Sequence, residues 1–167
     1  MKAILLAAGS GMRLGDLTKE TPKALVDING KTLLERQIIA LQKNNINDII
    51  VVTGPNNDKF DIKDITCIHD SNYLEHDVLG TMMSASEYMN SDVIISYTDI
   101  VFDEKIIHSI KNVNNDINIA VEMDWTKTYV DRTEHPIDEA ANVLIEDGLV
   151  KKIGHQTKRF GFFKKDS

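Results

Sequence analysis

The chain has 167 residues, of which 42% are hydrophobic and 27% are charged, and its formal net charge is −7 at pH 7. This length and composition predict one soluble globular domain with a substantial core. The acidic charge argues against non-specific binding to nucleic acid and against an anionic membrane partner. The single cysteine excludes an intramolecular disulfide, and no apolar stretch approaches the ~20 residues of a membrane-spanning helix, so we expect a cytoplasmic protein.

The amino-terminal stretch combines glycines with cations. An apolar run over residues 3–8 predicts a buried strand, and it leads directly into Gly9-Ser10-Gly11. Glycines let backbone N–H groups approach an anion closely, because they carry no Cβ. Arg13 and Lys23 add positive charge nearby. The strand, the loop and the two cations together indicate a phosphate-binding site.

Two familiar phosphate-binding loops do not fit this stretch. The P-loop pattern requires a second glycine five residues after the first, followed by lysine, but Leu14 stands five residues after Gly9. The dinucleotide fingerprint requires a glycine at that same position and an immediate helix. Gly15, Pro22 and two threonines favour an extended loop over residues 14–22 instead.

The next elements predict the fold class. Residues 32–43 should form a helix, because Thr32 and Glu35 have the spacing of a capping box and apolar residues follow at helical spacing. The β-branched run 49–53 predicts a second buried strand. Strand, helix and strand form a βαβ-type unit, so we expect an α/β fold of Rossmann-like type. We expect this fold to be a three-layer α/β/α sandwich whose middle layer is a mostly parallel sheet.

The middle of the chain continues this alternation. A short third strand is expected at residues 65–68, with Cys67 in the core. A polar segment over residues 70–77 then leads into a helix. Its side chains Met82, Met83 and Met89 are expected to fill the core rather than to bind a ligand.

An aspartate follows the fourth predicted strand. Residues 93–97 indicate a strand buried on both faces, and Asp99 stands at its carboxyl end. Open α/β sheets bind ligands outside the carboxyl ends of their strands, so Asp99 should face the glycine loop. A carboxylate opposite a phosphate loop is where Mg²⁺ would join protein and phosphate oxygens. Asp103 then has the residue type that caps a further helix.

The last third of the chain is expected to be mainly strands. Residues 117–121 predict one strand. Asp147-Gly148 is a strong hairpin signal between apolar stretches at residues 142–145 and 149–153. Residues 159–163 predict one more strand.

The amino-terminal motifs resemble those of a known family. Leu-Ala-Ala-Gly-x-Gly-x-Arg at residues 6–13, Thr-x-x-x-Pro-Lys-Ala-Leu at 18–25 and Leu-Leu-Glu-Arg at 33–36 resemble the signature of nucleotidyltransferases. These enzymes join a nucleoside triphosphate to a phosphorylated acceptor, and they include sugar-phosphate nucleotidyltransferases and phosphocholine cytidylyltransferases. The resemblance implies the nucleotide-diphospho-sugar transferase type of α/β fold.

The resemblance also implies roles for particular residues. Arg13 would bind the leaving β- and γ-phosphates, Lys23 would neutralise the α-phosphate, and Asp99 would hold Mg²⁺. The remaining nucleotide contacts would come from the phosphate loop and the base-reading stretch, namely Leu6, Ala8, Gly9, Ser10, Gly11, Asn72, Gly80 and Thr81. An acceptor headgroup would meet aromatic and acidic side chains, namely Asp124, Trp125, Tyr129 and Glu134.

The chain is short for this family. Related proteins continue past the point that corresponds to Ser167 and have a second metal-binding aspartate there. We therefore expect residues 1–167 to form a single nucleotidyltransferase domain that lacks the carboxyl-terminal part of the family fold. Such a domain should still bind a Mg²⁺-nucleotide but be slow or inactive in nucleotidyl transfer. It should also have an uncovered sheet edge, which favours a homo-oligomer or a partner that covers this edge.

The preferred hypothesis is a cytidylyltransferase that uses CTP and a small phosphorylated or phosphonate acceptor such as phosphocholine. Three alternatives stay open: a sugar-1-phosphate nucleotidyltransferase that uses UTP, dTTP or GTP, a nucleotide-binding protein without catalysis, and a glycosyltransferase. Glycosyltransferases with a similar sheet typically show an Asp-x-Asp motif, which the run from Asp99 to Val101 lacks.

Overall fold

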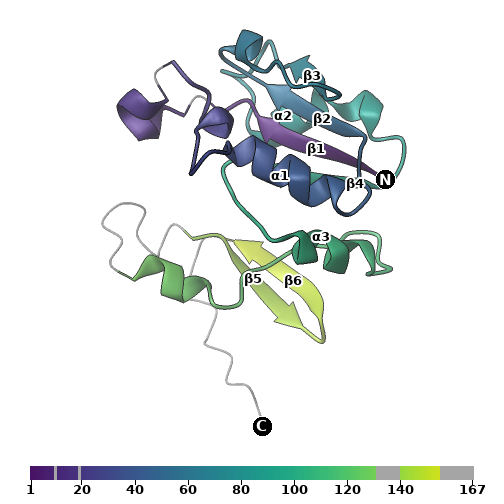
Figure 1. Cartoon of the computed structure of the whole chain (residues 1–167). Helices are drawn as coiled ribbons and strands as arrows, with labels where there is room; N and C mark the ends of the chain where they lie inside the picture. Colours follow the sequence, from purple (N-terminus) through teal and green to yellow (C-terminus); the bar gives the residue numbers. More distant parts are fainter. Residues whose placement is uncertain (10, 19, 131–139, 155–167) are drawn as a thin grey trace. The chain divides into compact units, whose positions relative to one another are not determined.

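A computed structural model describes the chain except for Ser10, Lys19 and residues 131–139 and 155–167. The side chains of residues 12–14 and 128 also lie outside the description. The chain divides into two compact units, Met1–Asp116 and Ile117–Ser167. The first unit contains a parallel sheet with helices, and the second contains a β-hairpin (Figure 1).

The first unit is built on a four-stranded sheet in the order β3-β2-β1-β4. All three neighbouring pairs are parallel, which confirms the predicted parallel sheet. Leu5 in the central strand pairs with Val51 on one side and with Ser96 on the other. The strands are β1 (Lys2–Ala7), β2 (Ile49–Thr53), β3 (Thr66–His69) and β4 (Val93–Tyr97).

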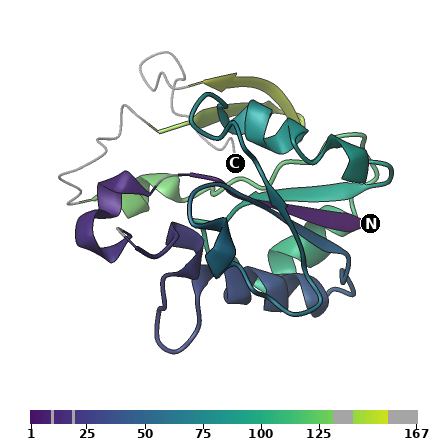
Figure 2. The same cartoon turned by 90° about the horizontal axis from the view of Figure 1, so that it is seen from above.

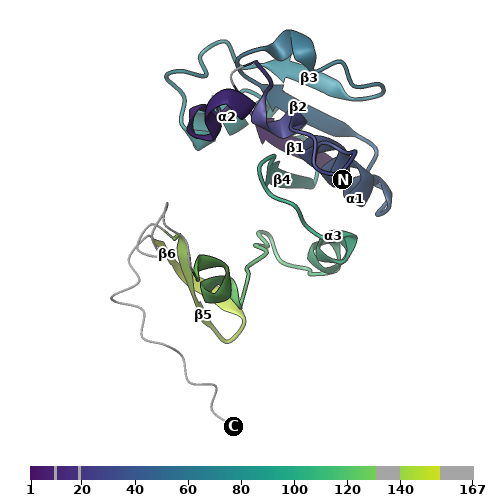
Figure 3. The same ribbon diagram turned by 60° about the vertical axis from the view of Figure 1, so that its left-hand side comes forward.

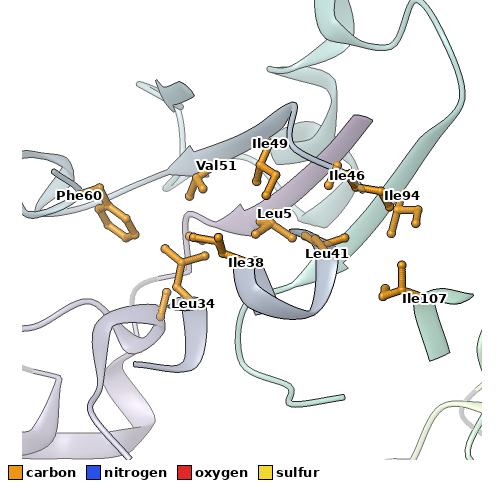
Figure 4. Packing of buried hydrophobic residues seen from close by; sticks show 13 residues of the cluster. Leu5, Leu34, Ile38, Leu41, Ile46, Ile49, Val51, Phe60, Ile94 and Ile107 are labelled. Atoms are coloured by element: carbon orange, nitrogen blue, oxygen red, sulfur yellow. The ribbon is translucent and has the colours of Figure 1, made fainter. Parts of the chain in front are cut away.

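Helices cover both faces of this sheet, as Figures 2 and 3 show. On one face α1 (Leu33–Gln42) and α3 (Glu104–Lys111) pack against Leu5 and its neighbours (Figure 4). On the other face Ile4 and Leu6 pack with residues of α2 (Val78–Met83) and with the segment that follows it. Successive side chains of a strand point to opposite faces, so the central apolar strand supplies both cores. The three-layer α/β/α sandwich is confirmed.

The predicted capping box begins α1. The Thr32 side chain accepts a hydrogen bond from the Glu35 backbone N–H, and the Glu35 carboxylate accepts one from the Thr32 N–H at 2.7 Å. These two bonds satisfy N–H groups that a helix start leaves without intrahelical partners. The Thr32 backbone N–H, together with the Thr32 side chain, holds the pKa of the Glu35 carboxyl below its usual value.

Four expectations about the first unit were wrong. Met83 does not fill the core and is 50% exposed, because successive residues of a helix point in different directions and Met82 is the one that packs on the sheet. β4 is buried on one face only, with Ile95 41% and Tyr97 51% exposed, because the helix on that face packs over the neighbouring strand β1. Cys67 is exposed, because its strand lies at the sheet edge. Residues 14–22 are not simply extended, since the short 3₁₀ helix η1 (Met12–Leu17) is followed closely by η2 (Lys23–Leu25).

The other short helices lie in connections. They are η3 (Asn57–Lys59) and η4 (Ser86–Tyr88) in the first unit and η5 (Trp125–Tyr129) in the second. Within the described ranges, none of the helices has the length and apolar character needed to cross a bilayer.

The second unit contains the predicted hairpin of β5 (Asn142–Glu146) and β6 (Leu149–Gly154), paired antiparallel. Asp147 and Gly148 both have positive φ angles, 53° and 74°, as the tight turn between the strands requires. The strand expected at residues 117–121 does not form, and Ile117 is 82% exposed. The strand expected at residues 159–163 lies outside the described residues.

Candidate functional site

The glycine loop begins where β1 ends. Gly9 is exposed and stands two residues after the strand, and apart from its chain neighbours no described atom lies within 4 Å of the position that a Cβ would occupy on it. Gly11 has a φ of 67°, a left-handed conformation that favours glycine. The buried Thr18 closes the loop, because its hydroxyl donates to the Gly11 carbonyl at 2.7 Å. The Gly11 end of the loop is therefore held in place by Thr18, while Gly9 is accessible.

Gly54 supports this loop from the neighbouring strand, and sequence reasoning missed it. A Cβ on Gly54 would lie 2.3 Å from the carbonyl oxygen of Ala8. Only glycine allows β2 to leave the sheet this close to the loop backbone. A glycine at the carboxyl end of a buried strand could have indicated such a close approach, because it carries no Cβ.

Lys23 and Asp99 are brought together from positions far apart in the chain. The Lys23 ammonium nitrogen lies 2.9 Å from Oδ2 of Asp99, and the two side chains are 37% and 45% exposed. Asp99 stands two residues after β4, and Gly9 stands two residues after the adjacent parallel strand β1. A cation, a carboxylate and a glycine loop thus follow the carboxyl ends of neighbouring strands, where open α/β sheets bind ligands.

The backbone turn that presents Asp99 is held on two sides. Thr98 donates both its backbone N–H and its hydroxyl to the carbonyl oxygen of Leu6, at 3.3 and 2.9 Å. From α1, Nε2 of the buried Gln37 donates to the carbonyl oxygens of Tyr97 at 2.7 Å and Ile100 at 2.6 Å. Sequence reasoning missed Gln37, although a polar residue on the apolar face of an amphipathic helix could have indicated a buried partner.

Asp99 fits Mg²⁺ as one of its ligands. Its carboxylate is a hard oxygen donor at a partly exposed position. Among the described residues there is no group of three or more acidic, histidine or cysteine side chains that could hold a metal. Mg²⁺ commonly binds through one or two carboxylates, with substrate phosphates and water as its other ligands. Asp99 would therefore bind the ion together with a nucleotide rather than alone.

The predicted base-reading residues surround a buried carboxylate, Asp70, which follows β3. Asp70 is 2% exposed and accepts hydrogen bonds from the Asn72 N–H at 3.0 Å and the Thr81 hydroxyl at 3.2 Å. Its other contact is Nδ1 of His76, at 3.0 Å. Gly80 leaves room for this histidine, because a Cβ there would lie 2.8 Å from the His76 side chain.

Hydrogen bonds favour the ionised form of the Asp70 carboxylate. Burial raises the pKa of Asp70, but the hydrogen bonds from His76, Asn72 and Thr81 outweigh it and hold the pKa below its usual value. Sequence reasoning missed Asp70 and His76, since residues 70–77 were interpreted only as a polar segment. Thr81 thus binds Asp70 and Gly80 leaves space for His76, and the contact of Gly80 and Thr81 with a base stays a prediction.

The predicted acceptor residues lie in the second unit, in and beside η5. The rings of Trp125 and Tyr129 meet edge to face, with centroids 5.6 Å apart and planes at 84°. Asp124 forms an exposed ion pair with Lys127 at 2.9 Å. Glu134 and Ser10 lie outside the described residues, as does the Arg13 side chain. Their predicted roles stay predictions.

Comparison with known proteins shows the family. Residues 3–142 match the model of the MobA-like NTP transferase domain. CTP:phosphoglutamine cytidylyltransferase of Campylobacter jejuni is 31% identical over 173 residues, which cover 96% of this chain and 68% of that protein. The structure of CTP:phosphocholine cytidylyltransferase from Streptococcus pneumoniae is 33% identical with a TM-score of 0.57, over 62% of this chain and 49% of that one.

A more distant structure extends the fold comparison. The inositol-1-phosphate CTP transferase of T. maritima has a TM-score of 0.70 at 18% identity, over 95% of this chain and 65% of that one. At this identity the likeness concerns the fold alone. The match to the pneumococcal structure spans about half of that protein's length. The resemblance in the amino-terminal motifs is thereby confirmed, and the chain belongs to the nucleotidyltransferase family of MobA-like NTP transferase domains.

Proposed function

We propose that this chain transfers CMP from CTP to a small phosphorylated acceptor such as phosphocholine and releases pyrophosphate. The observation that carries the proposal is the pair of Lys23 and Asp99, whose charged atoms lie 2.9 Å apart beyond the carboxyl ends of β1 and β4. The names of two relatives, a phosphoglutamine and a phosphocholine cytidylyltransferase, support CTP as the nucleotide and a phosphorylated small molecule as the acceptor.

The reaction is an in-line displacement at the α-phosphorus of CTP. An oxygen of the acceptor's phosphate forms a bond to that phosphorus, and the bond from it to the oxygen of the β-phosphate breaks. Such a reaction needs positioning and charge neutralisation rather than a covalent intermediate. Lys23 neutralises the α-phosphate, Arg13 binds the leaving β- and γ-phosphates, and the N–H groups of residues 9–11 line the triphosphate.

Asp99 would hold the Mg²⁺ that accompanies the triphosphate, and the ion would supply additional neutralisation of phosphate charge. In the structure, Asp99 is paired with Lys23, and both side chains are more than a third exposed. An exposed ion pair contributes only ~0–1 kcal/mol. Lys23 can therefore exchange the carboxylate for a phosphate oxygen at little cost when the nucleotide binds.

Base and acceptor would contact different parts of the chain. Asn72, Gly80 and Thr81, in the segment that includes the start of α2, would contact the cytosine. In the second unit, Trp125 and Tyr129 would offer aromatic faces to an alkylammonium headgroup, since cations are attracted to such faces. Asp124 and Glu134 would add negative charge for the same headgroup.

Pyrophosphate release tests the proposal. CTP, UTP, GTP, ATP and dTTP are each incubated with Mg²⁺ and the chain, alone, with phosphocholine, or with glucose 1-phosphate. We expect release from CTP that depends on phosphocholine. Release from UTP, dTTP or GTP with the sugar phosphate would identify a sugar-phosphate nucleotidyltransferase instead. Binding of CTP without any release would identify a nucleotide-binding protein that does not catalyse transfer.

A further inference from the structure

We infer that Gln37 is a positioning residue for the metal-binding carboxylate of Asp99, and this inference rests on the proposed function. Gln37 lies on α1, more than sixty residues before Asp99, and its side chain is 1% exposed. Both hydrogen bonds of its amide nitrogen go to backbone carbonyls on either side of Asp99, those of Tyr97 and Ile100.

The chemistry of the amide fixes its orientation. An amide nitrogen has two hydrogens to donate, and both are used on these two carbonyl oxygens, at 2.7 and 2.6 Å. Turning the amide over would place Oε1 of Gln37 against two other acceptors, which is repulsive. Gln37 therefore clamps the two carbonyls in one relative position, and the two residues between them, Thr98 and Asp99, are held with it.

Packing alone does not explain an amide at this position. The neighbours of Gln37 on the buried side of α1, Leu34, Ile38 and Leu41, are all apolar. Oε1 of Gln37 is itself buried and has no hydrogen-bond partner among the described residues. Burying an unpaired acceptor is unfavourable, and an apolar side chain would avoid it. The amide of Gln37 is therefore explained by its hydrogen bonds to the two carbonyl oxygens of the turn that contains Asp99.

The rest of the turn is consistent with this role. Thr98 is tied to the carbonyl of Leu6 on β1, so the turn is fixed to both the helix and the central strand. The Asp99 side chain nevertheless stays 45% exposed. A rigid backbone with an outward carboxylate is preorganised to bind a cation, because little ordering is left to occur on binding.

The test separates metal binding from stability. CTP is titrated calorimetrically into the protein without acceptor, once with excess EDTA and once with Mn²⁺, and the ratio of the two dissociation constants gives the metal-dependent gain in affinity. Gln37→Met keeps the side-chain volume but removes the amide. We expect it to lower the gain on the order of tenfold, as loss of a partner that orients a metal ligand does. The metal-free affinity should stay that of the parent.

Asn44→Leu is the matched control, because the Asn44 amide also donates to two backbone carbonyls, those of Ala40 and Glu104, both at 2.9 Å. It should lower the melting temperature and leave the gain unchanged. In Asp99→Asn the gain should disappear, and adding Gln37→Met to it should change nothing more. A gain in Gln37→Met equal to that of the parent overturns the inference.

Three further outcomes are decisive. If Gln37→Met does not fold, Thr98→Val loosens the same turn by one hydroxyl, and an unchanged gain in that variant overturns the inference. If the parent binds CTP with a gain that Asp99→Asn retains, the metal role of Asp99 in the proposed function fails, and the role of Gln37 fails with it. A gain lost in Asp99→Asn but kept in Gln37→Met overturns the positioning role alone.

Discussion

The backbones of Gly54 and Ala8 approach each other so closely that a Cβ on Gly54 would lie 2.3 Å from the Ala8 carbonyl oxygen and 2.9 Å from the Ala8 Cα. Ala8 immediately precedes the glycine loop, and Gly54 immediately follows β2. The position of the glycine loop relative to the sheet therefore depends on the absence of a side chain at Gly54, immediately after β2.

Gly54→Ala should move the loop and weaken the fold. The added methyl group meets backbone atoms that cannot rotate away, and such overpacking costs ~1–3 kcal/mol of unfolding free energy. CTP affinity should fall together with stability. Urea unfolding followed by circular dichroism measures the first effect, and calorimetry measures the second.

Gly9→Ala is the contrasting variant for this prediction. Apart from its chain neighbours, no described atom lies within 4 Å of a Cβ at Gly9, so the unfolding free energy of this variant should change by only about ±0.5 kcal/mol. Its CTP affinity should still fall, because the proposed function places phosphate against this part of the loop backbone. Parent-like stability in Gly54→Ala would show that the backbone contact with Ala8 relaxes freely.

Asp70 should make the stability of the fold depend on acid pH. Its folded-state pKa lies below its usual value, so the ionised carboxylate stabilises the fold above the unfolded pKa of ~3.9. This contribution is lost as the pH falls through the lower, folded-state pKa. Asp70→Asn should cost ~1–3 kcal/mol at pH 7, because buried donors lose a charged acceptor.

The pH profile distinguishes this effect from general acid unfolding. The difference in unfolding free energy between parent and Asp70→Asn should be largest at neutral pH and should shrink as the pH falls below about 4. Asp92→Asn, at an exposed position, serves as the control and should follow the parent at every pH. A difference that does not change between pH 7 and pH 3 would contradict the role of the Asp70 charge.

Trp125→Ala should weaken binding of the acceptor and leave binding of the nucleotide unchanged. Trp125 is half-buried and meets Tyr129 edge to face in η5, within the second unit. Loss of a cation–π contact at a partly exposed site is worth ~0.5–1 kcal/mol, and more if the headgroup is desolvated. The KM for phosphocholine should rise at least severalfold while the dissociation constant of CTP stays that of the parent. Met123→Ala, which removes an exposed neighbouring apolar side chain, should change neither value.

Lys23→Ala should impair transfer much more than folding. Its exposed pair with Asp99 contributes little to stability, but loss of one preorganised charge donor removes ~3 kcal/mol of transition-state stabilisation. The kcat for pyrophosphate release from CTP should fall about 10²–10³-fold. Lys31→Ala, at an exposed position beside α1, is the charge-matched control and should retain the parent rate. Turnover by Lys23→Ala at that rate would exclude a role for this ammonium group.

Local patterns predicted the frame of the first unit. The apolar runs of β1 and β2 and the capping box of α1 are encoded within a few neighbouring residues, and all three appear where they were expected. The rule that parallel strands present their carboxyl ends together also predicted that Asp99 would face the glycine loop. Asp99 and Gly9 each stand two residues after adjacent parallel strands, and the Asp99 carboxylate contacts Lys23.

Contacts between distant segments were not predictable in the same way. Burial of Ile95 depends on which strand a helix of another segment covers, and an apolar strand pattern does not encode that. The partners of Gln37 lie at least sixty residues away, and the need for Gly54 arises from the backbone of another strand. The expected homo-oligomer and the single-domain organisation stay predictions.

The affinity of the chain for CTP relative to UTP, GTP, ATP and dTTP tests the proposed function most directly. It is measured by calorimetry with Mg²⁺ and without acceptor. CTP should bind most tightly, and Lys23→Ala and Asp99→Asn should each weaken CTP binding, because in the proposed function Lys23 contacts the triphosphate and Asp99 holds its Mg²⁺. Tighter binding of UTP or dTTP than of CTP, or parent-like CTP affinity in both variants, would contradict the proposed function.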